Sequence, residues 1–160
     1  MQRALGTAQA PEPVSCAATI DTAGKTAEFS GKSVVFNTNI ELKYYMKFES
    51  GQSLENVSLR LSYTAVDGQQ YNTTIPFSMF SYDSGQSEYS AKLTTIAAKD
   101  MGCPVTAGIY SGDTLISDII VYSLETYCYN RLQKSTDIIY KALIRDMVKY
   151  GRSATAYFRH

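Results

Sequence analysis

The sequence contains no tryptophan, a single histidine (His160) and only three cysteines, Cys16, Cys103 and Cys128. Most nucleophile–base pairs and many zinc sites rely on histidine, so one terminal histidine leaves little for either chemistry. Three cysteines allow one disulfide at most, and their spacing fits neither a zinc site nor a redox pair. We therefore expect small, buried thiols and a chain that is not an enzyme.

The chain also has no net charge, because fifteen Lys and Arg residues balance fifteen Asp and Glu residues, and residues of one charge sign form no long run. Nucleic acids and anionic membranes are bound by basic patches, so neither is an expected partner. The longest apolar runs, such as residues 115–121, fall far short of the ~20 residues that cross a membrane. We predict no membrane insertion.

The length of 160 residues fits one domain with its own core. Residues 1–13 are rich in Gln, Ala, Thr and Pro, which predicts a flexible leader or linker before a single module over residues 14–160. Residues 1–10 lack the apolar segment of an export signal. If the protein is exported, we expect this sequence to be a piece of a larger multidomain chain.

Most of the chain alternates between apolar and polar residues, as half-buried strands do. Residues 34–48 read as one such strand, and residues 57–65 as another. Asp67-Gly68 and Gly112-Asp113 are typical of tight hairpin turns. Residues 80–87 predict a loop that carries Tyr82, and residues 96–102 a single helical turn that buries Ile96 and Met101.

Helical periodicity appears only near the end of the chain. Ser123 and the Ser135–Asp137 segment are good N-caps, which predicts helices over about residues 123–133 and 137–158. A mid-helix Gly costs ~1 kcal/mol against Ala, so Gly151 either ends the second helix or packs too closely for a Cβ; we predict continuation. Apolar residues recur at steps of three and four residues along one face of that helix, namely Ile139, Leu143, Met147, Tyr150, Ala154 and Tyr157 or Phe158. The predicted fold class is mainly β: an antiparallel, immunoglobulin-like β-sandwich of seven to nine strands with a C-terminal two-helix hairpin packed on it.

Thirteen tyrosines accompany the absence of tryptophan. Tyrosine rings can stack on sugars while their hydroxyls stay solvated. Tyr45 and Tyr110 alternate out of phase with the core residues of their strands, so these two and Tyr82 are the candidate ligand-binding residues. The alternative is that all three are half-buried sheet residues. The remaining tyrosines at core positions are expected to be structural: Tyr44, Tyr63, Tyr127, Tyr150 and Tyr157.

The acidic residues Asp67, Asp83, Asp113 and Asp118 do not form the closely spaced series of a calcium loop. We therefore predict no metal site and no cofactor, with a structural calcium ion as the less favoured alternative. Each lies in a predicted turn or at the surface, which does not favour the converging carboxylates of a glycosidase.

Three segments resemble an accessory module found in large secreted and cell-surface proteins of Clostridia and Ruminococcus-type gut bacteria. They are Ile-Ala-Ala-Lys-Asp-Met at 96–101, Tyr-Ser-Leu-Glu-Thr-Tyr at 122–127, and Lys-Tyr-Gly-Arg-Ser-Ala-Thr-Ala-Tyr-Phe at 149–158. Their order and spacing agree over roughly the last 65 residues. Arg152, Ser153 and Cys128 depart from the family pattern, in which alanine is usual at each position.

The resemblance implies a non-catalytic, extracellular module of a bacterial secreted or cell-surface protein. Together with the tyrosines, it leads us to expect a module that binds carbohydrate or presents neighbouring domains. The alternative is a protein–protein interaction or spacer module without affinity for glycans. The expected partner is a polysaccharide or another surface protein.

Overall fold

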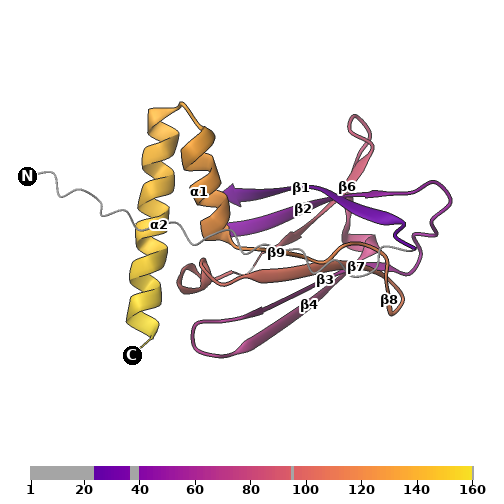
Figure 1. Ribbon diagram of the computed structural model, residues 1–160, viewed down its shortest axis with the longest axis horizontal. Helices are drawn as coiled ribbons and strands as arrows, with labels where there is room; N and C mark the ends of the chain where they lie inside the picture. The colour runs from indigo at the N-terminus through magenta and orange to yellow at the C-terminus, as the bar shows by residue number, and fades with distance from the viewer. Residues whose placement is uncertain (1–23, 37–39, 95, 160) are drawn as a thin grey trace, which may run out of the picture.

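A computed structural model of the protein describes residues 24–36, 40–94 and 96–159 (Figure 1). Within these ranges the chain is mainly β, with nine strands in two antiparallel sheets and two C-terminal helices. The sheets lie one over the other in Figure 1, and a single apolar cluster joins them. The fold is therefore sandwich-like, as predicted. The predicted leader at 1–13, Cys16 and His160 lie outside the described residues.

The first sheet has the strand order β1-β2-β6-β5. Its members are β1 (Ala27–Phe36), β2 (Ile40–Phe48), β5 (Ser81–Asp83) and β6 (Glu88–Leu93). The prediction of one strand over residues 34–48 is wrong, because this stretch contributes to two strands that pair with Val34 opposite Leu42. Residues directly opposite each other in a sheet have side chains on the same face. Val34 and Leu42 therefore both face the core, and the alternation of apolar and polar residues did not reveal where one strand ends and the next begins.

The second sheet has the order β4-β3-β7-β8, and β9 also pairs with β7. Its strands are β3 (Val57–Thr64), β4 (Gln70–Pro76), β7 (Val105–Ser111), β8 (Thr114–Leu115) and β9 (Ile120–Tyr122). Both predicted hairpin turns are confirmed. Gly68 and Gly112 have φ angles of 86° and 58°, which glycine adopts without the steric cost that a Cβ would bring.

The core lies between the two sheets. The largest fully buried side chains include Leu42, Tyr44 and Met46 of β2, facing Leu59 of β3 and Ile109 of β7. The hydroxyl of Tyr44 meets no hydrogen-bond partner among the described residues. The structural roles predicted for Tyr44, Tyr63 and Tyr127 are confirmed by their burial.

Two short 3₁₀ helices connect the sheets, η1 (Phe77–Met79) and η2 (Ala98–Asp100). Ile96 and Met101 flank η2 and are both buried, which confirms the predicted turn. Asp100 is buried as well, and its carboxylate accepts hydrogen bonds from the Val66 backbone N–H and the Lys99 ammonium, each at 3.0 Å. A buried carboxylate needs such partners, so these bonds hold η2 against the β3–β4 turn.

The C-terminal helices are α1 (Leu124–Lys134) and α2 (Ile138–Phe158). The predicted caps are present: Ser123 accepts a hydrogen bond from the Thr126 N–H, and Asp137 accepts from the N–H groups of Ile139 and Tyr140. Figure 1 shows the pair at one end of the two sheets, with α2 outermost. The helices contact each other, and α2 also contacts η2. No helix in the described ranges is long and apolar enough to span a membrane.

Gly151 forms the closest contact between α2 and η2. A Cβ at this position would lie 2.7 Å from Met101 Sδ and 3.2 Å from the backbone oxygen of Ala98. One helical turn later, the Thr155 hydroxyl donates a hydrogen bond of 2.5 Å to the carbonyl of Lys99. Close packing at Gly151 is therefore confirmed, and two of the segments that carry the family resemblance contact each other here.

The orientation of α2 differs from the expectation. Tyr150 and Tyr157 were expected to be structural, but their side chains are 68% and 76% exposed. The side that packs against the rest of the protein instead presents Ile144 and Gly151. Small residues allow the helix to approach η2 closely, and the wider apolar side is consequently turned outward.

Candidate functional site

The three tyrosines proposed from the sequence lie on three separate parts of the protein. Tyr45 is half-buried in β2, on the outer face of the first sheet, because its neighbours Tyr44 and Met46 point into the core. Its hydroxyl lies 3.2 Å from Ser33 Oγ, and the Lys43 ammonium lies 5.0 Å from the ring centroid. These contacts within the sheet account for Tyr45 without a ligand.

Tyr82 belongs to strand β5 and not to a loop, so that prediction is wrong. Its side chain is 57% exposed, and its ring centroid lies 4.7 Å from that of Tyr89. Tyr89 in turn contacts Phe48 and Phe77, with centroids 5.6 Å and 5.1 Å away. Tyr82 is thus the exposed end of an aromatic cluster at the edge of the first sheet.

Tyr110 lies in β7 on the outer face of the second sheet, since Ile109 beside it is fully buried in the core. The guanidinium of Arg60 sits 4.3 Å from the centroid of its ring. Arg60 is held there by hydrogen bonds to the carbonyl of Gly112, at 2.7 Å, and to Asp113 Oδ1, at 2.9 Å. Arg60 and Tyr110 therefore form a fixed pair of side chains on this face.

A hollow of about 180 Å³ lies beside this pair. Its lining includes Gly108, where an added Cβ would come within 3.1 Å of both Tyr110 Cε2 and Leu115 Cδ1. Glycine thus leaves room both for the hollow and for the Tyr110 ring.

Polar side chains from three neighbouring strands complete the hollow. Strand register places Thr74 opposite Arg60, and both Asn72 and Thr106 opposite Ser62. Ser62, Asn72, Thr74 and Thr106 make no side-chain hydrogen bond to any other described residue. Three hydroxyls and one amide are thus available to a ligand next to an aromatic ring and a guanidinium.

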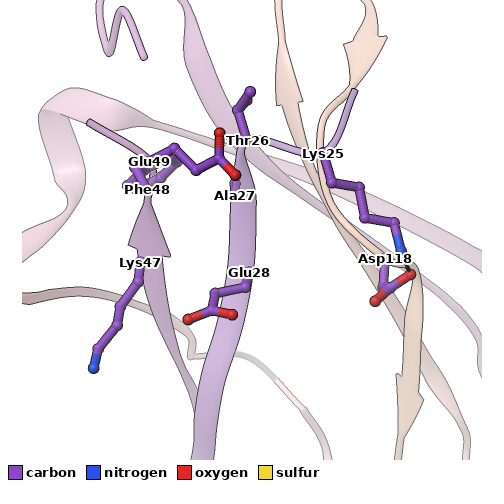
Figure 2. Close-up of a pocket in the computed structure, with 8 residues that line it drawn as sticks. All are labelled: Lys25, Thr26, Ala27, Glu28, Lys47, Phe48, Glu49 and Asp118. Atoms are coloured by element: carbon purple, nitrogen blue, oxygen red, sulfur yellow. Dashed lines mark hydrogen bonds and ion pairs between the residues drawn. The ribbon is translucent and has the colours of Figure 1, made fainter. Parts of the chain in front are cut away.

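A second hollow, of about 380 Å³, lies between the start of β1 and the end of β2 (Figure 2). Lys25 forms an ion pair with Asp118 across it. Figure 2 shows the carboxylates of Glu28 and Glu49 between the two strands, while Lys47 points away. Charges of both signs line the space, and its aromatic residue, Phe48, contacts Tyr89 of the core edge. The Thr26 hydroxyl in the lining donates a hydrogen bond of 2.5 Å to Gln52 Oε1.

A third hollow, of about 500 Å³, lies where α2 meets η2, and Cys103 is among its lining residues. Burial, followed by the negative charge of Asp100, raises the pKa of the Cys103 thiol. Reactive cysteines have a lowered pKa, so Cys103 is not activated. Among the charged side chains that line this hollow, Lys99 is paired with Asp100 at 3.0 Å and Arg152 with Glu125 at 2.6 Å, and Arg159 lines it as well.

The described residues also contain no group of three or more His, Cys, Asp or Glu side chains close enough to hold a metal ion. Of these three hollows, the one beside Tyr110 brings together the most polar side chains that make no side-chain hydrogen bond to another described residue. Sequence reasoning identified Tyr110 but missed Arg60, Asn72 and Thr74. The polar phase of β3 was visible in the sequence, but the register that unites it with β4 and β7 was not.

No protein-family model matches the chain, and no curated protein is significantly similar to it.

Proposed function

We propose that the protein is a non-catalytic binding module whose ligand is a polysaccharide, held in the hollow beside Tyr110. The observation that carries this proposal is the set of four unpaired polar side chains, from β3, β4 and β7, that share one hollow with Tyr110 and Arg60. Sugar hydroxyls both donate and accept hydrogen bonds, and so do the hydroxyl and amide groups found there.

The aromatic ring supports the same ligand class. Sugar rings have apolar faces that pack on aromatic side chains, while their edges carry hydroxyls. Arg60 is fixed by Gly112 and Asp113, so its remaining N–H groups can donate to a ligand without the cost of ordering a free side chain. The family resemblance adds an extracellular setting on a bacterial surface protein and attachment to further domains, and the alternating strands support an immunoglobulin-like layout of the two sheets.

Affinity gel electrophoresis with a panel of plant polysaccharides and host mucin glycans tests the proposal. We expect at least one polysaccharide to retard the protein, and Asn72→Ala combined with Thr74→Ala to weaken retardation by about tenfold, as loss of two hydrogen bonds predicts. Both side chains are exposed, so the double variant is expected to fold. Tyr110→Ala should abolish retardation.

Tyr45→Ala is the matched control, because Tyr45 lies on the outer face of the other sheet. Retardation that persists in the Asn72 and Thr74 double variant but disappears in Tyr45→Ala would contradict the proposed site. Retardation by none of the glycans would favour the alternative of an interaction or spacer module. That alternative draws support from the apolar side chains exposed on α2.

A further inference from the structure

The outer face of α2 exposes more large apolar side chains than any other element in the described ranges. Ile139 is 83% exposed, Leu143 50%, Tyr150 68% and Tyr157 76%. The opposite face of the same helix is occupied by its packing against η2 and α1. Contiguous apolar surface of this kind marks interaction sites on soluble proteins.

The exposed residues follow the spacing of a coiled-coil seam. Ile139, Leu143, Tyr150 and Tyr157, with Asp146 and Ser153 between them, recur at alternating steps of four and three residues. Such steps place all six side chains along one line of the helix. With 21 residues, α2 offers three heptads over a length of ~31 Å. We refer to these six residues as the α2 seam.

Charge on this helix is not balanced, although the whole chain is neutral. Residues 138–159 hold five of the fifteen basic residues and one of the fifteen acidic residues, giving a net charge of +4 (five minus one). Arg152 is paired with Glu125, but Arg145 and Lys149 are exposed and form no ion pair with another described residue, and Lys149 lies one position before Tyr150 of the seam. An acidic partner would complement this charge, whereas a second copy of α2 would bring more positive charge to it.

Asp146 distinguishes a protein partner from a lipid surface. It lies within the seam, between Leu143 and Tyr150, and is exposed. Burying this carboxylate against acyl chains would be costly because nothing there could pair with it. A partner helix can offer a basic side chain opposite Asp146, and one polar position in a seam also fixes the register of two helices.

We propose that the α2 seam is the docking site for an acidic amphipathic helix of another protein or domain. The partner helix would place apolar side chains against Ile139, Leu143, Tyr150 and Tyr157, acidic side chains beside Lys149, and a basic side chain opposite Asp146. This inference is independent of glycan binding, because the hollow beside Tyr110 lies on a different element.

A synthetic 21-residue helix provides the probe, by analogy with the length of α2. The acidic peptide carries Leu at the seam positions, Glu at the flanking positions and one Arg in the layer that faces Asp146; a companion peptide carries Lys at the flanking positions. Each is labelled with fluorescein, and binding to the whole chain is followed by fluorescence anisotropy. We expect the acidic peptide to bind at least about tenfold more tightly than the basic one, with affinity that falls as salt rises.

Variants locate the binding surface. Leu143→Glu and Tyr150→Glu should each weaken the acidic peptide by about tenfold or more, because truncating or charging a central apolar anchor typically costs that much. Met79→Glu is the matched control. Met79 in η1 is a large apolar residue like Leu143, and its side chain is 71% exposed, but it lies outside α2. Circular dichroism checks that all three variants remain folded.

Any one of the following results would overturn the proposal. If the chain binds both peptides equally well, or binds neither, charge complementarity does not select the partner. If Met79→Glu weakens binding as much as Tyr150→Glu does, the peptide does not bind at the α2 seam. Cosedimentation with vesicles of phosphatidylcholine and phosphatidylglycerol, lost in Tyr150→Glu while the acidic peptide fails to bind, assigns the face to membranes. A dimer lost in the same variant, again without peptide binding, assigns it to self-association. None of these outcomes changes the glycan assay.

Discussion

Replacing Gly151 by alanine adds one methyl group at the contact between α2 and η2, and two opposing effects decide what this does to stability. In an open helix position, alanine stabilises by ~1 kcal/mol relative to glycine. At Gly151, however, the new Cβ would lie 2.7 Å from Met101 Sδ and 3.2 Å from the Ala98 backbone oxygen. The Met101 side chain has some freedom to move, but the backbone of η2 does not.

Inserting a methyl group into a well-packed contact costs roughly 1–3 kcal/mol. Subtracting the helix-propensity gain leaves a net loss of about 1 kcal/mol in the free energy of unfolding for Gly151→Ala. Gly151→Leu should lose more, because its side chain must displace α2 from η2. Urea denaturation followed by far-UV circular dichroism, with linear extrapolation, measures both changes.

Ala142→Gly is the matched control at an exposed position of α2. It should destabilise by ~1 kcal/mol through propensity alone. The two substitutions are opposite in kind, glycine to alanine at 151 and alanine to glycine at 142, yet we expect both to lower the free energy of unfolding. A stabilisation of about 1 kcal/mol by Gly151→Ala would show that no tight contact exists there.

Two further predictions concern buried ionisable groups. Burial raises the pKa of Tyr44 above its ordinary value of 10.0. The folded protein therefore keeps the Tyr44 proton at a pH where the unfolded chain loses it, so the free energy of unfolding falls as the pH rises above 10. Tyr44→Phe should therefore flatten the fall in unfolding free energy between pH 10 and 12 by at most ~1.4 kcal/mol per pH unit, and an unchanged slope in denaturation curves would contradict this. Burial, and secondarily the negative charge of Glu125, raises the pKa of the Cys128 thiol to about 11. In a Cys16→Ser, Cys103→Ser variant we therefore expect Cys128 not to react with Ellman's reagent at pH 8 until urea unfolds the protein. Rapid labelling of the folded chain at Cys128 would show that the site opens readily.

The sheets were predictable because their signal is local. Alternation along β2 and β3 predicted which residues are buried, and Gly68 and Gly112 marked two turns whose backbone geometry favours glycine. The two helices and their caps were predictable for the same reason. Each depends on residues within three or four positions of one another.

The orientation of α2 and the composition of the hollow beside Tyr110 were not predictable in this way. Periodicity shows that Leu143, Tyr150 and Tyr157 share a helix face, but the tight fit of Gly151 on η2 determines which face turns inward. Arg60 and Thr74 become neighbours of Tyr110 only through pairing between distant strands. Contacts of that kind depend on register and are not written in either segment alone.

The position of η2 has a mechanical consequence. This short turn carries the chain from β6 in one sheet to β7 in the other, and α2 is fastened to it at Gly151 and Thr155. A load on the last helix is therefore transmitted to the crossing between the two layers and not to a strand end alone. Whatever steadies that helix also restrains sliding of one layer over the other.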